Sequence, residues 1–321
     1  MIKKLLGAAS LLALAAAMSP LWAQSYPSGP VNLVITLAPG DASDIAGRAI
    51  AEALARELKV AVVPINRPGA GGALGTDLVV KGPKDGHTLV LTNNAAVVFR
   101  SVLDPDVATY DALKDLTPLA LAMRSPSTLA VGADQPFKSL SEMVEYAKRN
   151  PGKVRIGTAG VSSVGDFCVQ TINAFTGAGL TMVPFTGAAP AVTAMRGGHI
   201  EGVILALGTM TAHLSSGAVR GLAISSKWPD FPGIPTLAEL GYAQPLFGIW
   251  TAFFAPAGVP PEVSAVLVPA LERAIRSPEI GAKLKPLGIV AEYAPPEKLV
   301  AEMRDERARL IGIARQAGLV K

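Results

Sequence analysis

The sequence predicts an α/β protein with two domains, each built on a mostly parallel sheet flanked by helices. The length of 321 residues is about twice that of a common domain of roughly 150 residues, so two domains are expected. Half of the residues are hydrophobic and 17% are charged, a balance that excludes a disordered chain. Short apolar segments alternate with helical ones, which is typical of parallel strands joined by helices.

The first of two β-α series covers residues 31–92. Apolar runs bounded by glycine, proline or asparagine indicate strands, and apolar residues three or four positions apart indicate helices. The expected elements are, in order, a strand at 31–36, a turn at 39–44, a helix at 45–58, a strand at 60–65, a glycine-rich segment at 68–75 with a helix to 81, and a strand at 88–92.

The second series begins with a strand at 128–131. Ser139 and Glu142 form a capping box for a helix that stops at Asn150. The elements expected after it are strands at 154–158, 181–184, 200–205 and 221–225, and helices that run to 175 and 195. The last third adds a strand near 250–254 and helices at 261–275 and 296–317.

Residues 1–23 have the three parts of a secretory signal peptide. Lys3 and Lys4 precede an apolar run at 5–18, and Ala23 supplies the small residue for cleavage before Gln24. The alternative is a membrane anchor, but this run is shorter than the roughly 20 residues that a spanning helix needs. We therefore expect a mature chain that is not membrane-embedded and lies in the bacterial periplasm. Its single cysteine, Cys168, cannot form an internal disulfide and is expected in the core.

Residue patterns for catalysis, metals and cofactors are missing from the sequence. His87, His199 and His213 lie far apart without metal-ligand spacing. The segment 160–164 lacks the second glycine of a nucleophile elbow, and Ser163 is better interpreted as a helix cap with Asp166 three residues on. The glycines at 69–75 fit neither G-x-G-x-x-G nor a P-loop, and tight strand-to-helix packing explains them better. We expect no metal, no cofactor and no enzyme activity, and no basic stretch with aromatics indicates nucleic-acid binding.

Seven short motifs occur in order along the chain. They are YPSGPVNLV at 26–34, NRPGAGGALG at 66–75, DGHTL at 85–89, NPGK at 150–153, PFTGAAP at 184–190, IPTLAELG at 234–241 and FAPAGVP at 254–260. Together they resemble the Bug-type solute-binding proteins of tripartite tricarboxylate transporters. The resemblance spans nearly the whole mature chain.

This resemblance implies a two-lobed periplasmic-binding-protein fold of the Venus flytrap kind, similar to type II. It implies that residues 24–125 and 247–321 form the first lobe and residues 126–246 the second. The ligand would be a small carboxylate held in the cleft between the lobes. The loaded protein, expected to be a monomer, would deliver it to a membrane permease of two subunits.

Three small polar loops precede predicted helices, at 39–44, 159–163 and 186–190. In parallel sheets ligands bind beyond the carboxyl ends of the strands, and free N–H groups at helix N-termini attract a carboxylate without an arginine. The alternatives are ordinary turns for these loops and turn capping for Asn93 and Asn94. The predicted ligand-binding residues are Gly40, Asp41, Ala42, Ser43, Asp44, Asn93, Asn94, Thr158, Ala159, Gly160, Ser162, Ser163, Thr186, Gly187, Ala188, Ala189 and Leu205.

Two departures from the family pattern bear on specificity. Residues 41–43 replace a run of glycines, and Asp41 would repel a ligand carboxylate unless it points away or meets an amine or hydroxyl. Leu205 and Ala206 are apolar where the family commonly has an acidic or amide residue followed by serine. These features favour an aromatic or compact mono- or dicarboxylate over citrate. Phe99, Phe167 and Phe185 could supply an aromatic wall, although core packing fits them better.

Two other functional classes fit parts of the sequence. An extracytoplasmic sensor that presents its ligand to a receptor kinase would have the same fold and cleft, and only its docking partner would differ. An exported hydrolase would need a nucleophile and a base brought together by the fold, and the sequence contains no such motif.

Overall fold

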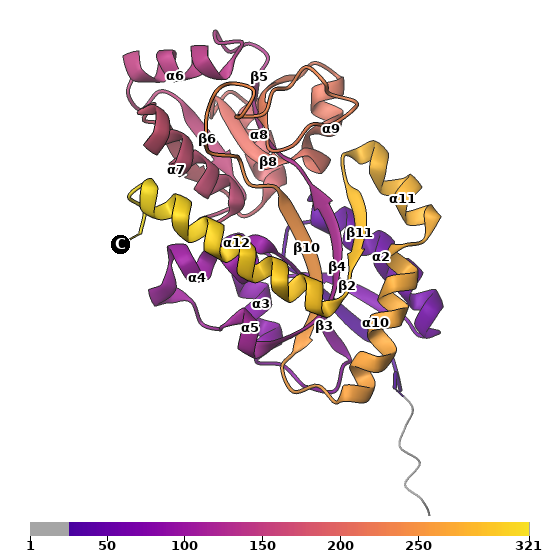
Figure 1. Ribbon diagram of the computed structural model, residues 1–321. Helices are drawn as coiled ribbons and strands as arrows, with labels where there is room; N and C mark the ends of the chain where they lie inside the picture. Colours follow the sequence, from indigo (N-terminus) through magenta and orange to yellow (C-terminus); the bar gives the residue numbers. More distant parts are fainter. Residues whose placement is uncertain (1–25, 321) are drawn as a thin grey trace, which may run out of the picture.

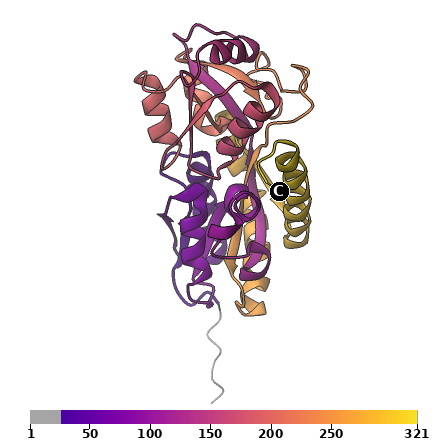
Figure 2. The same cartoon turned by 90° about the vertical axis from the view of Figure 1, so that its left-hand side faces the viewer.

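The computed structural model describes residues 26–320, so the predicted signal peptide lies outside the described residues. The chain forms two lobes, each built on one sheet flanked by helices. One lobe lies above the other in Figures 1 and 2. The six-stranded sheet has the order β11-β4-β10-β3-β1-β2, and the five-stranded sheet has the order β7-β6-β8-β5-β9. The two-lobed α/β class predicted from the sequence is confirmed.

The six-stranded sheet combines strands from both ends of the described chain. They are β1 (Val31–Ile35), β2 (Val62–Asn66), β3 (Thr88–Asn93), β4 (Leu116–Ser125), β10 (Ile249–Pro256) and β11 (Val290–Ala294). Strands β2 and β3 pair with β1 in parallel, whereas β10 runs antiparallel to both β3 and β4. The five-stranded sheet contains β5 (Ser127–Gly132), β6 (Arg155–Thr158), β7 (Thr181–Pro184), β8 (Gly202–Ala206) and β9 (Val219–Ile224).

The expectation of mostly parallel sheets is wrong. In the five-stranded sheet β6 pairs with β7 and β8 in parallel, but β5 runs antiparallel to β8 and β9. Both sheets are therefore mixed: β5 and β10, which enter from the other lobe, run opposite to their neighbours, and β11 runs opposite to β4. The β-α alternation predicted the parallel parts correctly and could not reveal these long-range antiparallel neighbours.

Helices cover both sheets. They are α2 (Ala42–Leu58), α3 (Ala73–Val80), α4 (Arg100–Leu103), α5 (Ala112–Asp115), α6 (Leu140–Arg149), α7 (Val164–Thr176), α8 (Ala188–Arg196), α9 (Leu207–Ser215), α10 (Pro261–Ile275), α11 (Pro278–Leu284) and α12 (Pro296–Gln316), with short turns η1 (Ala70–Gly72), η2 (Ala95–Phe99), η3 (Pro105–Val107) and η4 (Lys285–Leu287). Helix α10 and strand β7 have the predicted bounds. Helix α2 begins three residues earlier than predicted because Asp41 caps it.

Side chains of β1 alternate between two core regions, as the strand period of two requires. Leu33 and Ile35 pack with residues of α2 and α10, whereas Val34 packs in the cluster that contains α12 residues. Phe99 and Phe167 are fully buried and contact Phe247 edge to face, so core packing is the correct interpretation of both. Cys168 lies in the same core, where burial raises the pKa of its thiol to about 12.

Two segments of the chain cross between the lobes, and we call them the passages. Strand β4 continues through Pro126 into β5, and the segment after β9 returns to the first lobe at β10. The passages are joined, because Ser127 Oγ donates to the Phe247 carbonyl (2.6 Å) and Ile249 pairs with Ser125. The predicted lobe boundaries stay a prediction, and the membership of the strands in the two sheets is compatible with them.

Candidate functional site

A small cavity lies between the two sheets, where several strands end. Leu37 follows β1 and Asn93 ends β3, while Ala159 follows β6 and Leu205 lies near the end of β8. The cavity measures about 30 Å³, and its lining residues are Leu37, Asp41, Asn93, Ala159, Ser163, Val164, Gly165, Ile204, Leu205, Ala206 and Ile249. Both lobes thus contribute to it at the sheet edge where α/β proteins bind ligands.

Asp41 brings the N-terminus of α2 to this cavity. It is the N-cap residue of the helix, and its Oδ1 accepts the N–H of Ser43 at 3.0 Å. The side chain is 5% exposed, and burial raises the pKa of its carboxyl to about 6, with the neighbouring Asp44 acting in the same direction. Ser43 extends the network away from the helix end, because its Oγ lies 2.9 Å from Thr251 Oγ1 on β10.

The N-terminus of α7 faces the cavity from the other lobe. Ser163 is its N-cap and accepts the N–H of Asp166 at 3.2 Å, as the sequence predicted. Val164 and Gly165 follow at the first two helical positions and line the cavity. Their N–H groups have no acceptor within the helix, so they present donors and the positive end of the helix dipole to a ligand.

The rims of the two lobes are in contact. A Cβ atom at Gly160 would lie 3.2 Å from the backbone nitrogen of Gly71, and one at Gly187 would lie 2.6 Å from Ala38 Cβ. Ser162 Oγ donates a hydrogen bond to Asp104 Oδ2 of the first lobe. The lobes are therefore in contact at the mouth of the cleft.

The structure brings five of the predicted ligand-binding residues to the cavity: Asp41, Asn93, Ala159, Ser163 and Leu205. Ala42 and Ser43 are buried in the first turn of α2. Thr158 ends β6, and its Oγ1 donates a hydrogen bond to the Gly160 carbonyl, while Gly160 and Ser162 lie in the loop before α7. In the predicted loop at 186–190, Thr186 is exposed and Gly187 touches the other lobe, while Ala188 already belongs to α8.

Two predicted residues, Asp44 and Asn94, are hydrogen-bonded to other parts of the chain and do not line this cavity. Asn94 is fully buried, and its amide donates to the Gly248 carbonyl (3.0 Å) and to Glu306 (3.1 Å). Asp44 accepts hydrogen bonds from Arg48, Asn66 and the Gly40 N–H, which hold the loop before α2 in place. Gly40 and Ala189 line a separate hollow of about 470 Å³ together with Arg196 and His213.

Several residues that position the site are not identifiable from the sequence. Gly71 contacts the second lobe, and its φ of +63° favours glycine. The sequence alone indicated only tight packing of a strand against a helix for segment 69–75. Leu37, Ile204 and Ile249 have the sequence pattern of ordinary core residues. Only their positions at or near the ends of strands could have indicated that they line the cavity. Within residues 26–320, no three His, Cys, Asp or Glu side chains gather as a metal site would require.

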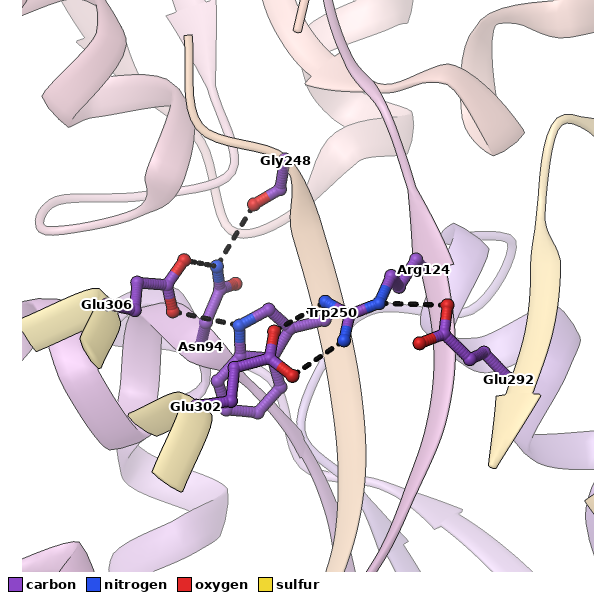
Figure 3. Close-up of polar contacts among 7 residues, drawn as sticks. All are labelled: Asn94, Arg124, Gly248, Trp250, Glu292, Glu302 and Glu306. Atoms are coloured by element: carbon purple, nitrogen blue, oxygen red, sulfur yellow. Dashed lines mark hydrogen bonds and ion pairs between the residues drawn. The ribbon is translucent and has the colours of Figure 1, made fainter. Parts of the chain in front are cut away.

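A larger groove of about 740 Å³ lies at the passages between the lobes. Figure 3 shows polar contacts among residues that line it: Arg124 contacts Glu292 and pairs with both oxygens of Glu302, while Glu306 accepts the indole N–H of Trp250 (2.8 Å). These groups satisfy one another. The groove also lacks the two helix N-termini that meet at the smaller cavity. We therefore regard the smaller cavity, and not the groove, as the candidate site.

Comparison with known proteins identifies relatives over nearly the whole chain. Residues 46–319 match the family described as the tripartite tricarboxylate transporter family receptor. Protein BugT of Bordetella pertussis is 30% identical over 309 residues, covering 96% of this chain and 95% of BugT.

Two solved structures are similar at the level of the fold. MatC from Rhodopseudomonas palustris with bound malate has a TM-score of 0.85 at 28% identity, covering 90% of this chain and 99% of MatC. An R. palustris protein solved with adipate has a TM-score of 0.85 at 27% identity, covering 92% of this chain and 99% of that one. None of the helices in the described part of the chain has the length and hydropathy needed to cross a bilayer.

Proposed function

Because this chain belongs to the tripartite tricarboxylate transporter receptor family, we propose that it captures a small carboxylate between its lobes and delivers it to a membrane permease of two subunits. Proteins of this family are periplasmic solute-binding proteins and not enzymes. The carboxylate proposed for this chain is aromatic or a compact mono- or dicarboxylate, and the working form is a monomer. The signal peptide at 1–23 would be removed after export.

The observation that carries this proposal is the convergence of two helix N-termini on one cavity. Asp41 begins α2 in one lobe, and Ser163 begins α7 in the other. A ligand carboxylate held by the N–H groups of Val164 and Gly165 would contact the second lobe while its remainder contacts the first. Ligand binding would thereby stabilise the closed arrangement, which is the form that a permease can distinguish from the empty protein.

The interactions available are strong enough for uptake. A partly buried helix N-terminus contributes up to about 2 kcal/mol toward a bound anion. Charge-assisted hydrogen bonds add about 1.5–3 kcal/mol each before the entropy of binding is subtracted. Two such loops acting on one ligand can reach the roughly 8 kcal/mol that corresponds to micromolar affinity.

A thermal-shift screen of the mature protein tests the proposal directly. The panel contains monocarboxylates, dicarboxylates, aromatic acids and amino acids, each paired with its uncharged amide. A ligand at 100 times its dissociation constant adds about 2.7 kcal/mol, so the expected result is a rise of a few degrees in the melting temperature with at least one acid but not with its amide. No shift with any acid, or equal shifts with acids and amides, would contradict carboxylate binding.

The structures solved with malate and adipate support a small acid as the ligand class. In this chain the second-lobe wall is apolar at Ile204, Leu205 and Ala206. An apolar wall cannot replace the water that a third charged group would lose on binding. Citrate is therefore expected to shift the melting temperature less than a compact mono- or dicarboxylate in the same screen.

A further inference from the structure

A buried hydrogen-bond network joins the last helix to the second passage (Figure 3). Asn94 Nδ2 donates to the Gly248 carbonyl at 3.0 Å and to Glu306 Oε1 at 3.1 Å. The other oxygen of Glu306, Oε2, accepts the indole N–H of Trp250 at 2.8 Å. Asn94 is 0% exposed and Glu306 is 3% exposed. The network thus connects α12 in the first lobe to the segment that crosses between the lobes.

Both oxygens of Glu306 face N–H donors. The indole nitrogen of Trp250 can only donate, and the atom of Asn94 that faces Glu306 is its amide nitrogen, which also can only donate. The O–H of a neutral carboxylic acid would have no acceptor in this arrangement. The contacts of Glu306 therefore fit its carboxylate form.

An unused acceptor lies on the same asparagine. Asn94 Oδ1 is buried and has no hydrogen-bond partner among the described residues. If the side-chain amide of Asn94 turned over, Oδ1 would face Glu306 and could accept the O–H of its carboxylic acid. The same turn would remove Nδ2 from the Gly248 carbonyl and leave two acceptors side by side. Proton uptake by Glu306 is therefore incompatible with the bond that ties Asn94 to the passage.

The surroundings of Glu306 place its proton uptake near neutral pH. Burial raises the pKa of its carboxyl to about 7, although the hydrogen bonds from Asn94 and Trp250 lower it. On the same helix, Glu302 raises this pKa and Arg309 lowers it.

The elements beside Glu306 carry four further charged side chains, which are Arg124 on β4, Glu292 on β11, Lys227 after β9 and Arg100 on α4. Arg124 pairs with Glu292 and with Glu302. Lys227 pairs with Glu239, and Arg100 acts on Tyr110. Within residues 26–320 Glu306 forms no ion pair, so its charge is stabilised mainly by the two N–H donors.

We propose that Glu306 is a proton-operated lock on the hinge formed by the passages: as a carboxylate it holds Asn94 on the Gly248 carbonyl, and on protonation Asn94 turns over and releases the passage. Glu306 acts through Asn94 and is thus a positioning residue. The lobes move more freely when Glu306 is protonated. Because a cleft between lobes exchanges its ligand by lobe movement, the rate of uptake depends on the pH of the compartment. Only this last step rests on the proposed function.

Hydrogen exchange of the ligand-free mature protein tests the release of the passage. Mass spectrometry follows a peptide that contains Phe247, Gly248 and Ile249. The pH is varied from about 5 to about 9, and each rate is corrected for the intrinsic rate at that pH. We expect protection to fall about fivefold on protonation of Glu306, which is the effect of losing one hydrogen bond. Equal protection across this range would overturn the proposal.

The indole signal of Trp250 reports the protonation of Glu306 separately. The mature chain retains Trp228 and Trp250, since Trp22 lies in the predicted signal peptide, so the two indole N–H signals can be resolved in a nitrogen-15 spectrum. The Trp250 signal should titrate with a midpoint at the Glu306 pKa of about 7. Trp228, whose indole N–H donates to Asp230, is the internal reference. A Trp250 signal that stays constant over this range would also overturn the proposal.

Two variants separate the proton from the lock. Asn94→Ala removes the link to Gly248, so protection of the passage should be low at every pH, while Trp250 still titrates and does so at a higher pH. Glu306→Gln is neutral at every pH and should show low protection without a titration of Trp250. Asp305→Asn is the matched control, because Asp305 is the exposed neighbour of Glu306 on the same helix. It should behave like the wild type.

The outcomes are distinguishable from those of the ligand screen. A pH dependence of passage protection that persists in Asn94→Ala or in Glu306→Gln would overturn the lock. If Glu306→Gln does not fold, as judged by circular dichroism, Asn94→Ala and the wild-type pH series still decide. These measurements are made without ligand, so their failure leaves carboxylate capture intact, and failure of every acid in the thermal-shift screen leaves the lock intact.

Discussion

Single residues at the lobe rims determine whether the cleft can close. Gly160 and Gly71 bring the backbones of the two lobes together, and Gly160 has a φ of +128°, which side-chain-bearing residues rarely adopt. Any side chain there would meet the Gly71 backbone and not the end of a flexible chain. The position is therefore sensitive in two ways, through backbone strain and through the space that closure requires.

Gly160→Asp is expected to abolish ligand binding while the protein still folds. The new side chain would hold the lobes apart and place a carboxylate near the donors at the start of α7, and the backbone strain is about 1–3 kcal/mol. Calorimetry should show a loss in affinity of about a hundredfold or more. Gly152→Asp is the control, because Gly152 also has a positive φ (+73°), but a Cβ atom there would meet no other part of the chain within 4 Å. Unchanged affinity in Gly160→Asp would remove this loop from the site.

Among the elements, α12 links the lobe passages to the first lobe. Its Glu306 is 3% exposed and accepts hydrogen bonds from Trp250 on β10 and from Asn94, which also donates to Gly248 (Figure 3). Burial raises the pKa of the Glu306 carboxyl to about 7. Glu302, which pairs with Arg124, raises this pKa further, and Arg309 lowers it.

Glu306 is expected to make the folded protein less stable as the pH rises from about 5 to about 8. Its pKa in the folded state, about 7, exceeds the value of 4.5 for the unfolded chain, so its contribution is fully present below 4.5 and is lost as the pH passes 7. The free energy of unfolding should fall by up to about 3 kcal/mol from this group. Asp41 acts in the same direction near pH 6, and His213, whose pKa is lowered, opposes them at lower pH.

Urea denaturation at several pH values measures this effect. In Glu306→Gln the fall in unfolding free energy between pH 5 and pH 8 should be reduced, although the amide lowers stability at every pH by placing a donor against Asn94 or Trp250. Glu262→Gln on α10, an exposed position, should keep the wild-type slope. A slope that is the same in Glu306→Gln and wild type would show that Glu306 does not titrate in this range.

The elements that sequence analysis predicted well are those whose periodicity is local. The stripe of Val263, Leu267 and Ala270 predicted α10, and that helix buries all three. Strand β4 was missed, because Pro118 interrupts an apolar run that fits a buried helix or a strand equally well. Its position depends on antiparallel pairing with β10, which is more than a hundred residues away in sequence. The hydrogen bond from Asn94 to Glu306 could not be predicted for the same reason, because Glu306 belongs to the last helix.

At the scale of the whole molecule, the lobes meet at two kinds of contact. The passages through Pro126 and Phe247 are held by the Ser127 hydrogen bond and can act as a hinge, since few residues cross between the sheets there. The rim contacts lie between Gly71 and Gly160 and between Asp104 and Ser162. Five residues predicted from the sequence line the cavity between the sheets: Asp41, Asn93, Ala159, Ser163 and Leu205.

We therefore expect the protein to be open without ligand and closed with it. A bound ligand that bridges α2 and α7 is expected to shift the equilibrium toward a closed cleft. Small-angle scattering should show a smaller radius of gyration at saturating ligand than without it. Gly160→Asp should keep the larger radius in both conditions, which separates closure from any effect of the ligand solution. Scattering profiles that are the same with and without ligand in the wild type would contradict a closing cleft, and the affinity would then have to come from one lobe alone.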